Sequence, residues 1–253
     1  MTINLYLDTI YHYTDIDTAL KILENQTLKF SQPETFNDPF DMHEALIDFS
    51  MNEEQAVIWI KNADIPDSKK AEFLNKLIDP EFRKELAGYR RQTITGLRND
   101  CGICCFSQKY DQPLMWSHYA KKHSGVCLGF NIHPVIHSPE IEFIVHPVNY
   151  VNSITAANYY EYGEGIVQYL LLTKSQIWAY EEEVRAVIID RKGQTFFNFD
   201  QKCLTDVYYG CKTSTQDIEA VEKLLQEKGY ITDKRQRMVI DESTFSIKPI
   251  NLS

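Results

Sequence analysis

Short strand-like segments are crowded into the part of the chain after residue 100, and they constrain the fold more than any other feature. Runs rich in β-branched and aromatic residues follow one another there, among them CGICCFS at 101–107, GVCLGFNI at 125–132 and IEFIVHPVNYV at 141–151. Segments with helical spacing interrupt these runs, at 113–123, 165–178 and 215–229. Such a mixture predicts an α+β fold.

The N-terminal part predicts a strand, a helix and a second strand. The first strand ends in YHYT at 11–14, and Asp15 or Asp17 can cap the helix that follows. Asn25 is a suitable helix stop, TLKFS at 27–31 reads as a strand, and the Asn-Asp-Pro sequence that follows predicts a turn.

Residues 51–99 predict a helical insertion into a single domain that spans 1–253. Apolar residues recur three and four positions apart throughout the insertion. Between Lys61 and Arg98 it carries nine Lys or Arg against six Asp or Glu. We favour the interpretation that these charges form a solvated helical face. The functional alternative is a basic surface that faces an anionic substrate.

The net charge of −10 over 253 residues argues against a nucleic-acid coat protein, which needs a positive field. A transient nucleic-acid acceptor remains compatible with a local basic patch. The start of the chain lacks a signal-peptide pattern, and no apolar run approaches the ~18 residues of a membrane span. We therefore expect a cytoplasmic protein without membrane contact.

The cysteines favour packing over metal binding. A zinc site would need a second close pair besides CGICC at 101–105, and Cys203 and Cys211 are too far apart to supply one. We expect Cys101, Cys104 and Cys105 to lie on a buried strand as free thiols. No His-Glu-x-x-His, Gly-rich phosphate loop or Gly-x-Ser-x-Gly elbow is present, so no metal is expected.

Two groups of ionisable residues are candidates for chemistry. In EEEVRAVI, strand alternation would put Glu181, Glu183 and Arg185 on one face. They form either a surface ion-pair ladder or the lining of a cleft in which Arg185 holds one carboxylate ionised. His12 is more often a hydrogen-bonded packing residue than a ligand, and sequence alone leaves both readings open.

The longer motifs resemble a bacterial family known as domain of unknown function 2971. The resemblance is carried by YHYT with the helix and FNDPFD that follow, by CFS, PLMWSHYA and HSGVCLGF, and by WAYEEEVR, and it extends from residue 5 to about residue 229. More distantly, the opening YHYT and the PLMWSHY segment resemble ADP-ribosyltransferase-like proteins, including DarT toxins and tRNA phosphotransferases.

The second resemblance implies an ADP-ribosyltransferase-like fold with a mixed or antiparallel sheet core and an NAD-using site. In it, His12 beside Tyr13 hydrogen-bonds the ribose of NAD, Trp116 or Tyr119 stacks on the nicotinamide, and Glu183 or Glu181 stabilises the reacting centre; Arg185 completes the nucleotide-binding set. The DarT-like arginine and asparagine contacts have no counterpart here.

Three functions follow from these observations. The first is an ADP-ribosyltransferase or NAD glycohydrolase acting on a nucleic-acid or protein acceptor in phage defence or toxin biology. The second is a non-catalytic module on the same fold that binds a nucleotide or a partner. The third, which we rank lowest, is a hydrolase or nuclease that uses His118 and the glutamates.

Overall fold

The computed structural model describes residues 9–131 and 143–252, which form two compact units. The first unit consists of residues 1–31, 101–148 and 177–253, and the second of residues 32–100 and 149–176. The start of the predicted family resemblance, residues 5–8, lies outside the described residues.

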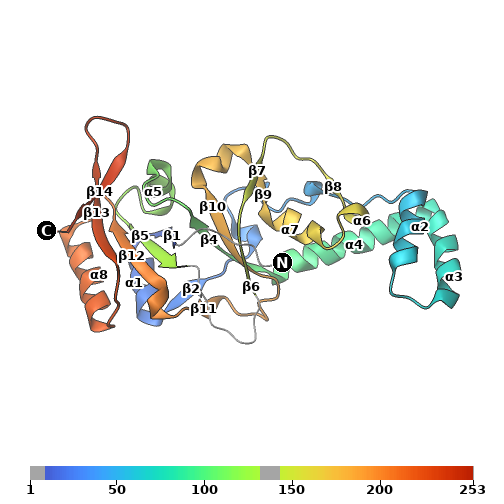
Figure 1. Cartoon of the computed structure of the whole chain (residues 1–253), viewed down its shortest axis with the longest axis horizontal. Helices are drawn as coiled ribbons and strands as arrows, with labels where there is room; N and C mark the ends of the chain where they lie inside the picture. Colours follow the sequence, from blue (N-terminus) through green and yellow to red (C-terminus); the bar gives the residue numbers. More distant parts are fainter. Residues whose placement is uncertain (1–8, 132–142, 253) are drawn as a thin grey trace. The chain divides into compact units, whose positions relative to one another are not determined.

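An eight-stranded sheet forms the centre of the first unit within the described residues (Figure 1). Its strand order is β14-β13-β12-β5-β1-β4-β10-β6, and only the β12–β13 pair is parallel. The strands are β1 Thr9–Thr14, β4 Gly102–Ser107, β5 Val126–Asn131, β6 Phe143–Pro147, β10 Glu183–Ile188, β12 Leu204–Tyr209, β13 Lys234–Ile240 and β14 Ile247–Asn251. This mixed, mainly antiparallel sheet confirms the predicted α+β class.

Alternation along the central strands gives the sheet two different apolar faces. On one face, Ile10 of β1 packs with α1 (Ile16–Asn25) and α8 (Thr215–Glu227), which Figure 1 shows together beside the sheet. On the other face, Tyr11 and Tyr13 pack against Met115 and Trp116 of α5 (Pro113–Tyr119). One face is therefore mostly aliphatic with phenylalanine, and the other is rich in tyrosine.

The predicted helix boundaries around α1 are confirmed. Asp15 is the N-cap, and its carboxylate accepts a hydrogen bond from the Thr18 backbone N–H at 2.9 Å. The helix ends at Asn25, and Gln26 closes it in a left-handed conformation. A short strand, β2 (Thr27–Lys29), follows and pairs with β11 (Phe196–Asn198).

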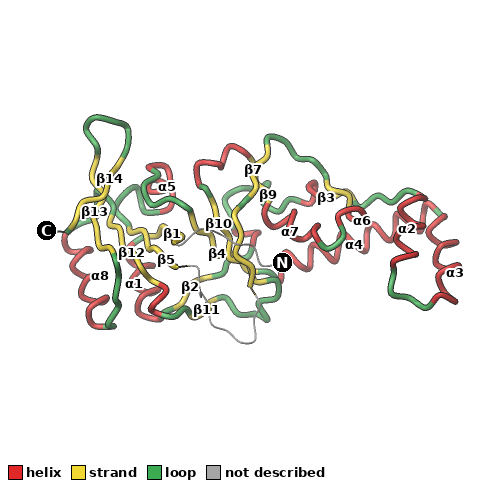
Figure 2. The backbone as a smooth tube through the Cα atoms, in the orientation of Figure 1, coloured by secondary structure: helices red, strands yellow, loops and turns green. Residues whose placement is uncertain are grey.

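Helices dominate the second unit (Figure 2). Residues 51–99 contain α2 (Glu53–Asn62), α3 (Asp67–Ile78) and most of α4 (Pro80–Asp100). The rest of the unit supplies α6 and α7 and four short strands: α6 Tyr159–Tyr162, α7 Gly165–Leu172, β3 Ile47–Asp48, β7 Asn149–Val151, β8 Ala157–Asn158 and β9 Thr173–Ser175. That the chain forms a single domain over 1–253 stays a prediction.

Two arginines of the basic insertion are used for packing inside this unit. The Arg90 guanidinium lies over the rings of Trp59 and Tyr159, 5.9 and 5.6 Å from their centroids. Arg91 lies 5.6 Å from the Phe49 ring centroid. Cation–π contacts of this kind stabilise the helices against the unit's aromatic residues, which favours a structural use of these two cations.

The helix predicted for 165–178 is wrong in its second half. The helix ends at Leu172, because β-branched Thr173 begins β9, which pairs in parallel with β7. The run at 141–151, which reads as one strand-like segment, contains two strands: β6 pairs with β10, and β7 pairs with β9. Residues 141–142 lie outside the described residues. Strands β13 and β14 were not predicted at all.

Two glycines provide a matched test of this packing. A Cβ on Gly125 would lie 2.2 Å from the Thr14 carbonyl oxygen, whereas one on Gly88, inside α4, would meet nothing within 4 Å. We expect Gly125→Ala to lower the free energy of unfolding by about 2 kcal/mol, because backbone must move. Gly88→Ala should raise it by about 0.5–1 kcal/mol, and chemical denaturation measures both. Equal effects at the two positions would contradict the described packing.

Candidate active site

Glu183 and Arg185 lie at the start of β10 on the tyrosine-rich side of the sheet. Arg185 donates from Nε to Glu183 Oε1 at 2.8 Å and from Nη2 to Oε2 at 3.2 Å. Glu183 is 3% exposed and Arg185 is fully buried. This burial excludes the surface ion-pair ladder, and the paired geometry gives the carboxylate a fixed orientation.

Glu181 reaches the same place by a different route from the one predicted. It is the last residue of the 3-10 helix η3 (Gln176–Glu181), and Glu182 has a left-handed backbone with φ of 41°. The strand that was to align Glu181 with Glu183 therefore begins only at Glu183, so the alternation argument for Glu181 is wrong. Glu181 is nonetheless buried, and its Oε1 accepts a 2.6 Å hydrogen bond from the Tyr119 hydroxyl.

Ser107, which the sequence analysis did not single out, joins the two glutamates. Its backbone pairs with Glu183 across β4 and β10, and its hydroxyl donates to the Glu181 carbonyl oxygen at 2.7 Å. Ser107 also pairs with Tyr11 on the other side, the only registered pair between β1 and β4 among the described residues. With about 4.8 Å between neighbouring strands, Tyr11 and Glu183 are about 10 Å apart.

His12 lies where β1 and β4 lose their pairing. Its Nδ1 contacts the Cys105 carbonyl oxygen at 3.0 Å. Because a carbonyl only accepts, Nδ1 carries the proton and Nε2 is left as an acceptor. Burial lowers the pKa of His12 below its ordinary value, which favours the neutral ring. Its ring lies 5.6 Å from that of Phe106, on the face away from Glu183.

The predicted aromatic residues occupy unequal positions. Trp116 is fully buried and donates from Nε1 to the Tyr110 carbonyl at 2.7 Å. Its ring meets that of Tyr13 edge-on at 5.3 Å, and the Tyr13 hydroxyl donates to the Lys109 carbonyl. Tyr119 is half-buried, so its ring is more accessible than those of Trp116 and Tyr13.

Neither a metal cluster nor a membrane helix is present in the described parts of the chain. No three or more His, Cys, Asp or Glu side chains among residues 9–131 and 143–252 are placed to hold a metal ion. No helix in these ranges has both the length and the apolar character needed to cross a membrane. Cys104 and Cys105 lie on β4 and Cys101 precedes it; Cys101 and Cys104 are buried as predicted, whereas Cys105 is only partly buried.

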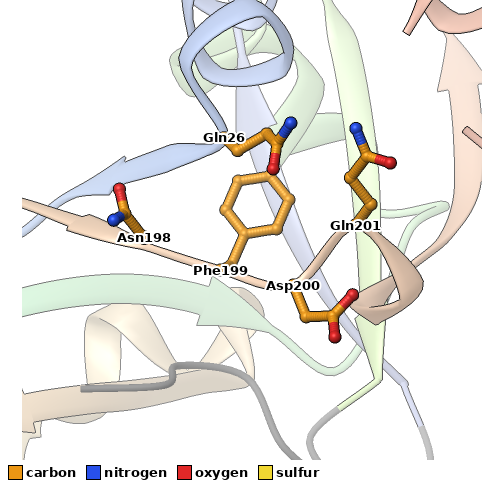
Figure 3. A pocket seen from close by; sticks show the side chains of 5 residues that line it. All are labelled: Gln26, Asn198, Phe199, Asp200 and Gln201. Atoms are coloured by element: carbon orange, nitrogen blue, oxygen red, sulfur yellow. The ribbon is translucent and has the colours of Figure 1, made fainter. Parts of the chain in front are cut away.

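A separate hollow of about 400 Å³ lies elsewhere in the first unit, and Figure 3 shows the five side chains that line it. They are Gln26, Asn198, Phe199, Asp200 and Gln201. None of the predicted site residues contributes to it, so it adds nothing to the chemistry described above.

A double-mutant cycle tests the buried ion pair. Arg185→Met should lower the free energy of unfolding by about 3–5 kcal/mol, because it leaves the Glu183 carboxylate buried without its guanidinium. Arg185→Met combined with Glu183→Leu should cost much less than the sum of the single variants. Additive losses in chemical denaturation would show that the two side chains are not coupled.

The lowered pKa of His12 predicts a pH dependence of stability. The unfolded chain takes up a proton at an ordinary histidine pKa of about 6.5, and the folded chain only at lower pH. The contribution of His12 to the free energy of unfolding is therefore fully present above that value. It decreases as the pH falls, by at most about 1.4 kcal/mol per pH unit. Denaturation of wild type and His12→Gln between neutral and acidic pH measures the difference. Parallel pH profiles would contradict the burial of the ring.

Comparison with known proteins gives one family match and weak structural similarities. Thermus sp. 2.9 DarT in complex with NAD+ aligns with 11% identity over 92% of this chain and 98% of that one, at a TM-score of 0.38. Thermus sp. 2.9 DarT in complex with ADP-ribosylated ssDNA gives 12% identity, coverages of 92% and 97%, and the same TM-score. Similarity at this level leaves function to the residues of this chain.

No curated protein matches the sequence. Residues 115–186 match the family model described as protein of unknown function DUF2971. The matched segment runs from α5 into β10 and so includes Trp116, Tyr119, Glu181, Glu183 and Arg185. The resemblance to the DUF2971 family predicted from the sequence is thus confirmed over this segment.

Proposed function

We propose that the protein is an NAD-dependent ADP-ribosyltransferase or NAD glycohydrolase. The single observation that carries the proposal is the burial of both Glu181 and Glu183 beside Ser107, whose hydroxyl donates to the Glu181 carbonyl and whose backbone pairs with Glu183. Glu183 forms an ion pair with Arg185, and Glu181 accepts a hydrogen bond from the Tyr119 hydroxyl. A buried carboxylate is suited to a ligand that carries or develops positive charge.

NAD provides such a charge in its nicotinamide ring and in the reaction itself. As the bond between ribose C1′ and the nicotinamide nitrogen breaks, its electron pair leaves with the nicotinamide and the ribose becomes oxocarbenium-like. A carboxylate fixed beside that carbon stabilises the charge, and water or an acceptor then attacks C1′ and loses a proton. We assign the carboxylate to Glu183, with Glu181 as the alternative.

The remaining predicted residues take binding roles in this proposal. His12 would accept a hydrogen bond from a ribose hydroxyl through Nε2, since Nδ1 is held by Cys105. Tyr119, the more accessible aromatic candidate, would offer its ring to the cationic nicotinamide. His12 and Glu183 lie on opposite faces of the sheet, so this proposal requires NAD to reach across the end of the β1–β4 pairing.

A second function is favoured by the Glu183–Arg185 pair. A carboxylate that is held at both oxygens by an arginine is also what a purely structural ion pair looks like. On this reading, the protein binds a nucleotide or a partner without turning it over. The acceptor, whether nucleic acid or protein, and a role in phage defence belong to the first proposal and follow only if turnover is found.

Nicotinamide release from NAD, followed by chromatography, tests the reaction. Glu183→Gln should reduce the rate by about 10²–10³, the usual cost of one electrostatic contact in a transition state. Glu182→Gln is the matched control, because Glu182 lies between the two candidates but is 40% exposed and contacts Lys109. Loss in Glu181→Gln alone would move the catalytic role to Glu181.

Thermal stabilisation by NAD separates the two proposals. Saturation to 100 times Kd adds about 2.7 kcal/mol, which His12→Gln should reduce and the control His43→Gln should not. Stabilisation without nicotinamide release, with every acceptor class supplied, would favour the binding module. The absence of any stabilisation at millimolar NAD would overturn the transferase proposal and favour a module that binds another nucleotide or a partner.

A further inference from the structure

The turn between α5 and β5 has an unusual backbone. Lys121, Lys122 and His123 have φ angles of 47°, 56° and 72°, so three successive residues other than glycine adopt the left-handed conformation. Each such residue is disfavoured by contact between its Cβ and the following carbonyl. Strain of this kind persists where surrounding structure fixes it, and it concentrates at functional sites.

Two sets of hydrogen bonds fix the turn. Within the α5–β5 connection, the His123 N–H donates to the Trp116 carbonyl at 3.0 Å, and the Gly125 N–H donates to the Ala120 carbonyl at 2.9 Å. From the segment after β12, the Lys212 N–H donates to the His123 carbonyl at 2.9 Å.

Close packing of the segment after β12 holds Lys212 beside the turn. A Cβ on Gly210 would lie 2.1 Å from the His123 carbonyl oxygen, so only glycine permits this approach. The Thr213 hydroxyl donates to the Gly125 carbonyl at 2.8 Å, and Arg237 Nη2 donates to the carbonyls of Cys211 and Thr213. The two loops are thereby joined through their backbones.

This junction places three lysines on two adjoining loops in a chain of net charge −10. Lys121, Lys122 and Lys212 are all exposed, and none is in a salt bridge with a residue in the described part of the chain. The one acidic group shown to respond to them is Asp15, whose lowered pKa has a small contribution from Lys121. Their charges are therefore available to an anion from solution.

His123 adds a hydrogen-bond donor to these charges. Its Nδ1 is buried and has no hydrogen-bond partner among the described residues. An unpaired lone pair costs less than an unpaired N–H, so the neutral ring carries its proton on Nε2. Burial and the charge of Lys212 both lower the pKa of His123. An anion bound beside the ring would instead raise the pKa of His123.

We propose that Lys121, Lys122, His123 and Lys212 form a binding site for the phosphate groups of a small phosphorylated ligand. Ammonium and imidazole N–H donors carried by two adjoining loops suit a multiply charged oxyanion. The site requires neither His12 nor the glutamates. It is also set apart along β1, because the turn leads into Val126, which pairs with Thr14, whereas Ser107 pairs with Tyr11.

Inorganic pyrophosphate is the first probe, at ionic strength matched with sodium chloride. We expect saturable thermal stabilisation of the wild-type protein and an upward shift of the His123 pKa measured by NMR of its ring. The triple variant Lys121→Gln, Lys122→Gln, Lys212→Gln should bind at least about tenfold more weakly, since charged hydrogen bonds are lost. The control Lys69→Gln, an exposed lysine on α3, should bind as the wild type does.

Two comparisons make the outcome decisive. Tighter binding of ADP than of inorganic pyrophosphate would identify a nucleotide as the source of the phosphates, and the reverse order would identify a free oxyanion. Equal binding by the wild type and the triple variant, or no saturable effect of either probe at millimolar concentration, would overturn the proposal. Because the three lysines are exposed, loss of folding in the triple variant is not expected, and its denaturation curve verifies this.

Discussion

The middle of the first unit depends on the backbone of Ser107. Ser107 pairs with Tyr11 on one side and with Glu183 on the other, so it joins β1 to β10 through β4. Its hydroxyl also holds the end of η3 through the Glu181 carbonyl. Since β1 and β4 share no other registered pair among the described residues, the sheet is continuous through this one pair, and beyond it the His12 ring rather than the backbone contacts β4.

Burial of charge is the chief energetic consequence of this arrangement. Glu181, Glu183 and Arg185 are each at least 97% buried, and each ion loses hydration that only its partners replace. The Tyr119 hydroxyl donates a hydrogen bond to Glu181, and the Arg185 guanidinium donates two to Glu183. Apolar residues would hold the sheet together at lower cost, so the retained charges are the strongest reason to look for chemistry at this place.

The two candidate sites of the first unit differ in physical character. Around Ser107 the ionisable groups are buried, with Glu183 bound to Arg185 and Glu181 bound to Tyr119. At the Lys121–His123 turn they are exposed, cationic and held in position by backbone contacts. A strained backbone supports the second site, and paired side chains support the first.

The sequence by itself determined the elements whose signals are local. The α+β class, the Asp15 cap, the helices within 51–99 and the buried cysteine strand all follow from spacing, capping chemistry and apolar runs, which act over a few residues. The end of α7 and the existence of β13 and β14 were missed, because strand pairing depends on partners far away in the chain.

The sites show the same division. The sequence identified His12, Tyr119, Glu181 and Glu183 from residue type and motif, but their relation was decided by tertiary structure. Only the register of β1, β4 and β10 introduces Ser107 between the glutamates, and only the break at Glu182 brings Glu181 in from a helix. The left-handed turn at 121–123 could not be predicted from the sequence either, because lysine and histidine rarely adopt this conformation. Here contacts with the distant segment 210–213 hold them in it.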